Sequence, residues 1–156
     1  EAEEIFWQMS VVDDALAAVE VGVRADGVTS MHDATECGIW GGLYEVARAS
    51  HVGMVIDKEK INVQDAIRRV CDLFQIDPYC SISEGTLLIT CRPHRVDALL
   101  EVFRTRRIPA SVVGEVVDEA RGIVVRSAGH EHPLEHPRVD PFWAAFGKEA
   151  AKPAAT

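Results

Sequence analysis

The chain has 156 residues, of which 47% are hydrophobic and 26% are charged, a composition typical of one globular domain rather than of a disordered or collagen-like chain. Its 25 acidic residues outnumber its 16 basic ones and give a net charge of -9, which disfavours a nucleic-acid backbone as partner. No apolar stretch approaches the ~18–20 residues of a membrane-spanning helix, so we expect no membrane partner either.

Cysteine usage argues against two common kinds of site. The cysteines stand at positions 37, 71, 80 and 91 and form no Cys-x-x-Cys pair, so neither a thiolate zinc site nor a thioredoxin-type motif is indicated. Cys71 and Cys91 lie within apolar patterns, where a free thiol behaves as a small buried hydrophobe. No charged segment followed by an apolar one opens the chain, which favours a reducing, cytoplasmic compartment.

Hydrophobic residues recur at helical spacing in several segments. The expected helices cover residues 12–24, 39–50, 62–74 and 93–107, and a short one begins at 141. The first helix has Ser10 as a plausible N-cap and is expected to bury Leu16, Val19 and Val23. The apolar side of the second consists of Ile39, Leu43, Val46 and Ala47.

The next two helices carry recognisable start signals. Asn62 and Asp65 have the spacing of a capping box, with Asp in place of the usual Glu or Gln. Pro93 is placed in the first turn of a helix, where proline is tolerated. The expected apolar faces are Ala66, Ile67, Val70, Cys71 and Phe74 in one helix, and Val96, Leu99, Leu100 and Phe103 in the other.

Short apolar and β-branched runs bounded by turn residues predict strands at 28–32, 52–56, 86–91, 110–117 and 122–125. Their alternation with helices predicts an α+β fold, a mixed sheet of about four to six strands covered by helices. The strand–helix–strand segment from Thr86 to Val117 is expected to form a right-handed crossover unit of ferredoxin-like type.

The character of the chain changes after residue 127. We therefore expect an α/β domain over 1–127, followed over 128–156 by a Pro- and His-rich linker and a short tail helix. Residues 128–139 have no period and are predicted as a loop. Asp140 and Pro141 are typical of an N-cap and a first helical position. Phe142, Trp143 and Phe146 are expected to dock this helix on the domain, with contact to a protein partner as the alternative.

The turn Asp33–Gly38 lies between an expected strand and an expected helix. Helix N-termini leave backbone N–H groups unpaired beside a partial positive charge, which makes such a turn a natural phosphate cradle. Thr35 can donate its hydroxyl to a phosphate oxygen, and Gly38 permits close approach of an anion. Asp33 can orient the turn or hold a metal-bound water. The alternative is plain capping by Asp33 or Thr35, with Gly41 and Gly42 allowing close packing on a strand.

A second loop, Ser81–Thr86, precedes the strongest predicted strand. Its Glu84 can meet a substrate hydroxyl, an amine or a metal, and Gly85 follows it directly. The alternative interpretation is an ordinary structural turn, since Ser-Glu-Gly alone is not specific.

Two charged clusters are interpreted more simply. The first cluster consists of His130, Glu131, His132, Glu135 and His136. Neutral imidazoles are common metal ligands. A proline interrupts this cluster and no scaffold supports it, so we expect an exposed loop rather than a metal site. A second cluster closes the helix that begins near Pro93, where cations complement the helix dipole. It consists of Arg104, Arg106 and Arg107, and recruitment of phosphate is the alternative there.

Several motifs occur together in an order that points to one family. They are Met31-His32-Asp33-Ala34-Thr35-Glu36, Leu43-Tyr44-Glu45-Val46-Ala47, Ile76-Asp77-Pro78 and Ser83-Glu84-Gly85-Thr86-Leu87-Leu88. With them the chain resembles, from about Ser10 to Val125, the C-terminal domain of the aminoimidazole ribonucleotide (AIR) synthase-related superfamily. The resemblance is nearest to the branch of hydrogenase expression/formation proteins and AIR-synthase-related proteins.

The resemblance implies an ATP-dependent enzyme that activates a poorly reactive, amide-like oxygen by phosphorylation. It implies a cleft between an N-terminal and a C-terminal domain, a homodimer, and a hydrogenase-maturation protein as partner. The N-terminal half would supply most Mg ligands and the nucleotide loop. The C-terminal domain would contribute the phosphate- and substrate-binding residues, which are Asp33, Thr35, Glu36, Gly38, Glu84 and Gly85. No catalytic residue and no metal ligand is assigned.

The sequence departs from the family pattern in three ways. Cys37 stands where a glycine pair is common, which narrows the expected cradle. The last cysteine is Cys91, whereas the resemblance implies a reactive cysteine at the end of a hydrogenase-maturation protein. The chain opens with Glu1 rather than Met, and we expect a piece of a longer polypeptide whose N-terminal half lies elsewhere. The isolated domain is accordingly expected to be inactive; the alternative is an interaction or dimerisation module without a catalytic role.

Overall fold

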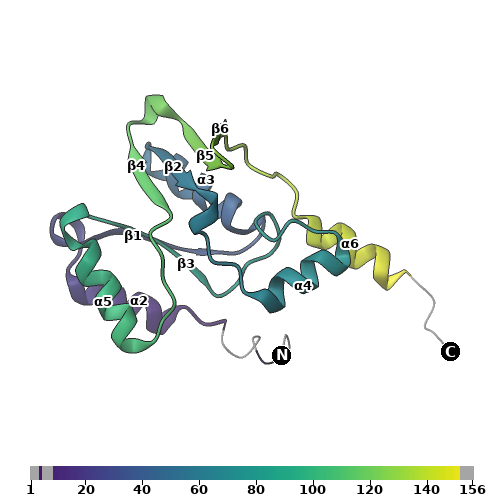
Figure 1. The fold of residues 1–156 in the computed structure, drawn as a ribbon, viewed down its shortest axis with the longest axis horizontal. Helices are drawn as coiled ribbons and strands as arrows, with labels where there is room; N and C mark the ends of the chain where they lie inside the picture. Colours follow the sequence, from purple (N-terminus) through teal and green to yellow (C-terminus); the bar gives the residue numbers. More distant parts are fainter. Residues whose placement is uncertain (1–3, 5–8, 152–156) are drawn as a thin grey trace.

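In the part of the chain that the structure describes, the fold contains two separate β-sheets (Figure 1). The structure, a computed structural model, describes residue 4 and residues 9–151. Strands β1 (Val28–Ala34) and β3 (Thr86–Cys91) pair antiparallel and form the first sheet. The second sheet has the order β4-β2-β5-β6, and only its central β2–β5 pair is parallel. Its strands are β2 (Gly53–Asp57), β4 (Gly114–Val117), β5 (Ile123–Ser127) and β6 (His130–Pro133).

Helices pack on both sheets, which confirms the predicted α+β class. They are α2 (Val12–Ala18), α3 (Gly38–Ser50), α4 (Asp65–Phe74), α5 (Val96–Arg106) and α6 (Pro141–Ala150). Short 3-10 turns occur at Val19–Val21, Arg24–Asp26, Lys58–Lys60, Pro93–Arg95 and Glu119–Arg121. None of the helices in the described part of the chain has the length and apolar character of a membrane span.

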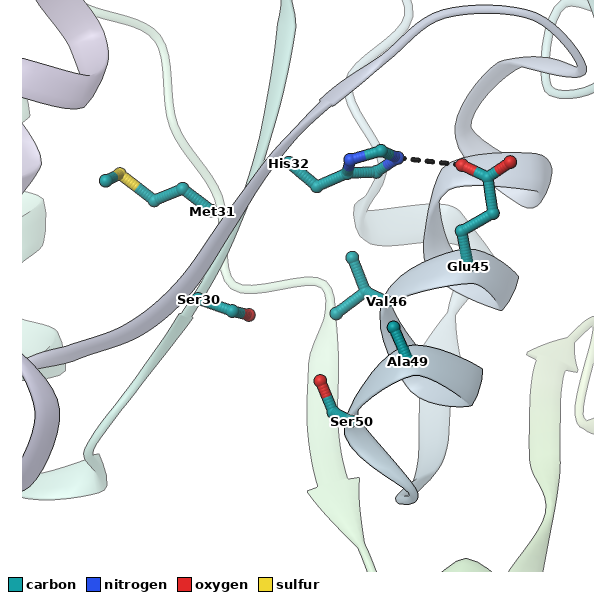
Figure 2. Close-up of a pocket in the computed structure, with 7 residues that line it drawn as sticks. All are labelled: Ser30, Met31, His32, Glu45, Val46, Ala49 and Ser50. Atoms are coloured by element: carbon teal, nitrogen blue, oxygen red, sulfur yellow. Dashed lines mark hydrogen bonds and ion pairs between the residues drawn. The ribbon is translucent and has the colours of Figure 1, made fainter.

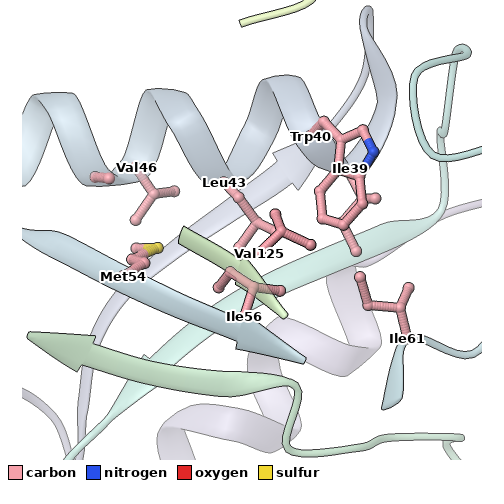
Figure 3. Close-up of a cluster of buried hydrophobic side chains, with 9 residues drawn as sticks. Ile39, Trp40, Leu43, Val46, Met54, Ile56, Ile61 and Val125 are labelled. Atoms are coloured by element: carbon pink, nitrogen blue, oxygen red, sulfur yellow. The ribbon is translucent and has the colours of Figure 1, made fainter. Parts of the chain in front are cut away.

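Helix α3 lies at the centre of the fold and packs on both sheets. Its predicted apolar side is buried, and in Figure 3 Leu43 and Val46 face Met54 and Ile56 of β2 and Val125 of β5. On the other side α3 approaches β1 and β3 at Gly42, where a Cβ would lie 2.8 Å from Leu88 Cδ1. The glycine is therefore required for close packing on a strand, as the capping alternative supposed.

The second core cluster joins α2 and α5 to the β1–β3 sheet. Leu99 and Phe103 of α5 are buried there, as predicted, against Ala17 and Ala18 of α2. The predicted face of the first helix is wrong, because its members are partly or largely exposed: Leu16, Val19 and Val23. Helix α2 ends at Ala18 and uses its small residues to approach α5, so the larger apolar side chains lie on its outer side.

The start of α4 also differs from the prediction. Gln64 occupies the N-cap position and no side-chain bond caps the helix, so Asn62 and Asp65 do not form a capping box. Of the predicted apolar face only Ala66 and Cys71 are buried. The remaining members of that face are substantially exposed, as is the neighbouring Leu73: Ile67, Val70 and Phe74.

The predicted crossover unit from Thr86 to Val117 is wrong. Strands β3 and β4 belong to different sheets, so α5 connects two sheets instead of crossing over one. The expected strand over 110–117 is also shorter, because only Gly114–Val117 pairs with β2. Sequence periodicity identifies strands but carries no information on which strand each will pair with.

The predicted loop over 128–139 is partly a strand. Residues 130–133 form β6, which pairs antiparallel with β5 across a two-residue turn at Ala128 and Gly129. Both turn residues have positive φ, as tight hairpins require. Glu131 of β6 forms ion pairs with Arg121 and Arg126, so a residue predicted in an exposed loop stabilises the hairpin.

The different burial of two leucines predicts that replacing each by alanine has a very different effect on stability. Leu43 of α3 is 5% exposed and Leu73 of α4 is 77% exposed. We expect Leu43→Ala to lower the free energy of unfolding by about 2–5 kcal/mol, because it leaves a cavity between α3 and the sheet. The matched Leu73→Ala should change it by no more than about 0.5 kcal/mol. Urea denaturation followed by circular dichroism measures both, and equal effects would contradict the assigned core.

Candidate functional site

The two loops singled out from the sequence lie together at one end of the β1–β3 sheet. Ala34 pairs with Thr86 in the last register position of the sheet. The backbone N–H of Ser83 then donates to the carbonyl of Thr35 over 3.1 Å, which ties the two loops directly to each other. The structure therefore brings the Asp33–Gly38 turn and the Ser81–Thr86 loop into a single polar edge.

The outer part of this edge is acidic and accessible. Glu36, Glu84 and Gly85 are exposed, and Thr35 is half-buried. The backbone N–H of Glu36 and the Thr35 hydroxyl donate to the Glu36 carboxylate, and together they lower its pKa. Gly85 has a φ of +86°, and a Cβ there would lie 3.0 Å from the Cα of Met9. These hydrogen bonds favour the ionised form of the Glu36 carboxylate, so the exposed side of the turn carries a negative charge.

Asp33 carries an unusual polar atom. Its Oδ1 is buried and has no hydrogen-bond partner among the residues that the structure describes. Buried carboxylate oxygens are normally paired, and an unpaired one costs free energy. Within residue 4 and residues 9–151 it is the one buried side-chain oxygen or nitrogen left in this state. This atom marks Asp33 as a group that residue 4 and residues 9–151 do not satisfy by themselves.

The start of α3 is closed rather than open. Cys37 N–H donates to Oδ2 of Asp140 over 2.8 Å, and Trp40 N–H donates to the Tyr79 carbonyl over 3.1 Å. Gly38 N–H donates to the carbonyl of Thr35 over 3.2 Å. The expectation that these donors are free to cradle a phosphate is wrong, because protein acceptors already occupy them. Capping by Asp33 or Thr35 is wrong too, since neither side chain caps the helix.

Gly38 serves packing rather than anion binding. It has a φ of +62°, and a Cβ there would lie 2.5 Å from the Ser81 carbonyl oxygen and 2.7 Å from that of Tyr79. The Trp40 and Tyr79 rings stack at 5.3 Å, which fixes the same loop against the helix. The glycine is therefore needed because the 79–81 backbone lies directly on the helix start.

Neither thiol near the turn is activated. Burial raises the pKa of the Cys37 thiol, and the carboxylates of Asp140, Glu45 and Glu36 raise it further. Burial and Asp77 raise the pKa of Cys80 to about 11. A thiolate nucleophile needs the opposite environment, with a pKa lowered by nearby positive charge.

The described residues do not form a magnesium site by themselves. Mg²⁺ is usually bound by one or two carboxylates together with phosphate oxygens and waters. The Asp33 oxygen is suited to that chemistry, yet residue 4 and residues 9–151 contain no group of three His, Cys, Asp or Glu side chains able to hold a metal. With the amides of Cys37, Gly38 and Trp40 also occupied, the described residues form neither a complete Mg²⁺ site nor a complete ATP site.

The other charged clusters have structural roles. His130 and His132 are exposed on β6, while the ring of His136 packs edge-on against Tyr44 at 5.3 Å. Arg104 pairs with Glu101, and Arg106 pairs with Glu20 of the Val19–Val21 turn. Arg107 is the left-handed residue that ends α5.

A shallow cavity of about 200 Å³ between β1 and α3 was not predicted from the sequence. Figure 2 shows His32 reaching from β1 to Glu45 of α3, and the two side chains hydrogen-bond at 2.8 Å. The cavity is lined by Ser30, Met31, His32, Glu45, Val46, Ala49 and Ser50. His32 and Ala34 share the strand face that meets α3, and this alternation is the one signal in the sequence that could have found the pair.

Comparison with known proteins identifies the domain. Residues 3–127 match the family described as AIR synthase related protein, C-terminal domain. The chain belongs to this family. The same region carries the motifs from which the resemblance was predicted, and that resemblance is confirmed.

Similar proteins of this family include two curated relatives and a solved structure. A hydrogenase expression/formation protein of Methanocaldococcus jannaschii is 25% identical over 126 residues, 80% of this chain and 37% of that protein. The carbamoyl dehydratase HypE of Cupriavidus necator is 34% identical over 100 residues, 63% of this chain and 28% of that protein. The crystal structure of Escherichia coli HypE, a hydrogenase maturation protein, aligns with a TM-score of 0.72 at 25% identity, covering 84% of this chain and 41% of that one.

The close packing at the start of α3 predicts that replacing Gly38 by alanine lowers stability, whereas the same change at an uncrowded glycine does not. We expect Gly38→Ala to destabilise the domain by at least about 1–3 kcal/mol, since the positive φ alone is strained for alanine and its Cβ would meet the Ser81 carbonyl. Gly147→Ala in α6, where no atom lies within 4 Å, should instead stabilise by about 0.5–1 kcal/mol. Thermal and urea unfolding measure both, and a tolerated Gly38→Ala would contradict the described packing.

The hydrogen bonds at Glu36 predict a titration change. Because the folded-state pKa is lowered, the stabilisation from this carboxylate is present above the ordinary glutamate pKa and is lost as pH falls through the lowered value. Thr35→Val removes one donor and should raise the Glu36 pKa towards its ordinary value, as measured by NMR titration. Thr90→Val, whose hydroxyl bonds Thr29 and Ser30 instead, is the control. Equal Glu36 titration in both variants would exclude the Thr35 contact.

Proposed function

We propose that this chain is the C-terminal half of an ATP-dependent, HypE-like hydrogenase-maturation enzyme. In this proposal the Asp33–Glu36 turn and the Glu84–Gly85 loop form one wall of an interdomain cleft. The observation that carries it is the buried Oδ1 of Asp33, which has no hydrogen-bond partner among the described residues. Asp33 lies where β1 enters the Asp33–Gly38 turn, and the Ser83 N–H to Thr35 carbonyl hydrogen bond joins this turn to the Ser81–Thr86 loop. In this proposal a group on the facing domain supplies the hydrogen-bond partner that the described residues do not offer to this oxygen.

The relatives support the ATP-dependent part of the proposal. The chain spans 28–37% of the length of the two curated relatives, one of which is named a carbamoyl dehydratase. A HypE of similar fold has been crystallised in complex with ATP, and another in complex with HypF. We extend the proposal to ATP and Mg²⁺ as cofactors of the complete enzyme. We further propose a cytoplasmic homodimer in which the partner domain is an AIR synthase-type N-terminal domain. Contact with a second maturation protein is also part of the proposal.

Different residues of this chain have different roles at the proposed cleft. The Thr35 hydroxyl and the Glu36 backbone hold the Glu36 carboxylate, which keeps that side of the wall negative. Glu84 presents an exposed carboxylate that can accept a hydrogen bond from a substrate amide or hydroxyl, with Gly85 leaving room beside it. Gly38 maintains the loop against α3. The nucleotide and metal are assigned to the partner domain, because the described residues form neither site.

The proposal predicts that the isolated chain does not turn over ATP. Purified residues 1–156 should hydrolyse ATP no faster than the Thr35→Ala variant or buffer alone, measured by phosphate release. An enzyme-like rate that Thr35→Ala abolishes would contradict the half-enzyme proposal, since this chain would then carry a complete site.

The same proposal assigns a role to Glu84 once an AIR synthase-type N-terminal domain is present on the same polypeptide. Loss of a hydrogen bond to a charged group costs about 1.5–3 kcal/mol, so Glu84→Gln should reduce kcat/KM about 10–100-fold. Glu115→Gln on the edge strand β4, away from both loops, is the control. Full activity of Glu84→Gln would exclude Glu84 from the cleft.

An interaction or dimerisation module is the second candidate function. It is favoured by the exposed apolar side chains of α4, which include Leu73 and Phe74. Under this alternative, Glu84→Gln and Thr35→Ala leave every activity of the assembled protein unchanged. Leu73→Asp would then shift the oligomeric state in size-exclusion chromatography with light scattering.

A further inference from the structure

Two groups of exposed side chains follow β5 along the chain. The first is aromatic: Trp143 and Phe146 are largely exposed, and Phe142 contacts both of their rings. The prediction that these side chains dock α6 on the domain is wrong, because none of the residues 141–150 that form the helix is buried. The second group is the pair His130 and His132 on β6, the outermost strand beside β5 in Figure 1.

Strand alternation directs these two histidines to the same face of the sheet. The register between β6 and β5 is regular along all four residues of β6. Successive side chains of a strand point to opposite faces, and residues two apart lie about 6–7 Å from each other. Glu131, between the histidines, forms its ion pairs with Arg121 and Arg126 on one face. His130 and His132 therefore lie together on the other face.

The hairpin fixes the spacing of the pair. The expectation that no scaffold supports these histidines is wrong, because the strand that carries them is hydrogen-bonded to β5. Directly after β6, the Leu134 N–H donates to the carbonyl of Ile123 over 2.8 Å. The ion pairs of Glu131 hold the same two strands. The backbone that presents the imidazoles is thus ordered before any ligand binds, which lowers the entropic cost of binding.

Both imidazoles are available to a ligand. His130 and His132 are exposed, and within the part of the chain that the structure describes neither ring makes a hydrogen bond or ion pair. The rings of His32 and His136 differ, because each takes part in a hydrogen bond. The pair on β6 therefore has no structural task that a ligand would disturb.

We propose that His130 and His132 form a two-ligand chelate site for a divalent transition-metal ion of the Zn²⁺ and Ni²⁺ class. Imidazole nitrogens bind Zn²⁺ at about 2.0–2.1 Å and also suit Ni²⁺ and Cu²⁺. Mg²⁺ prefers oxygen ligands and is not expected at this pair. The site goes beyond the proposed function and does not depend on it.

The ion at this site is exchangeable rather than structural. Residue 4 and residues 9–151 contain no group of three His, Cys, Asp or Glu side chains able to hold a metal, so the pair acts without a third protein ligand from the described chain. The remaining coordination positions belong to water or to a donor group of a second molecule. Structural zinc sites, in contrast, are closed by four protein ligands.

Isothermal titration calorimetry of the full chain with ZnCl₂, NiCl₂ and MgCl₂ tests the site. We expect heat of binding from Zn²⁺ and Ni²⁺ that depends on both histidines, and none from Mg²⁺. Loss of a group that merely orients a metal ligand costs about 10–100-fold in affinity, so His130→Ala and His132→Ala should each weaken Zn²⁺ binding at least about tenfold. His94→Ala is the matched control, because His94 is exposed in the turn Pro93–Arg95 and has no second histidine beside it.

The double variant distinguishes a chelate from two separate histidines. In a chelate, removal of one imidazole already destroys the site, so the double variant should bind Zn²⁺ no more weakly than either single variant. Two independent histidines would instead leave each single variant with half of the bound metal. Circular dichroism of every variant checks that the fold is retained.

NMR of the unmodified chain adds a measurement that needs no variant. Zn²⁺ should shift the ring signals of His130 and His132 and leave those of His94 in place. Any of three results would overturn the site: unchanged Zn²⁺ affinity in both single variants, a loss in only one of them, or equal ring shifts at His94. None of these experiments involves ATP turnover, so the proposed function stands or fails separately.

Discussion

The fold depends on burying one helix from two sides. Helix α3 lies between the sheets, and its first six residues, Gly38–Leu43, are all buried. A buried helix start cannot leave its backbone N–H groups to water, so the surrounding chain must supply acceptors. The carbonyl of Tyr79 and the carboxylate of Asp140 meet this requirement from two distant parts of the sequence. Glycines at 38 and 42 provide the space that such close approach needs.

This constraint determines what the candidate site offers. Because the amides of Cys37, Gly38 and Trp40 are used internally, the exposed polar groups are the side chains just before the helix and those of the neighbouring loop. Thr35, Glu36 and Glu84 then form an acidic edge, unlike the positively polarised pocket expected of a free helix start. An acidic edge repels bare phosphate. In the function proposed above, this edge meets a substrate amide, or a group whose charge is neutralised by a metal held on a facing domain.

Features that depend on neighbouring residues were predicted from the sequence, whereas contacts between residues far apart in the chain were missed. The apolar side of α3 and the N-cap role of Asp140 follow from spacing and residue type, and both are confirmed. That the two site loops meet was implied by the family resemblance; neither loop is specific alone. The Asp140–Cys37 contact joins residues 103 positions apart, and no periodic pattern encodes it. The outward-facing Leu16 and the division into two sheets were missed for the same reason, since both depend on pairing between remote segments.

The double cap at Asp140 has a consequence for where this domain can be cut. The family match ends at residue 127, before β6 and before Asp140. A version of the domain trimmed to that limit would lack the edge strand beside β5 and would leave the Cys37 amide buried without an acceptor. The segment matched by the family is thus shorter than the unit that satisfies its own backbone. The additional segment after β5 is part of the folded body.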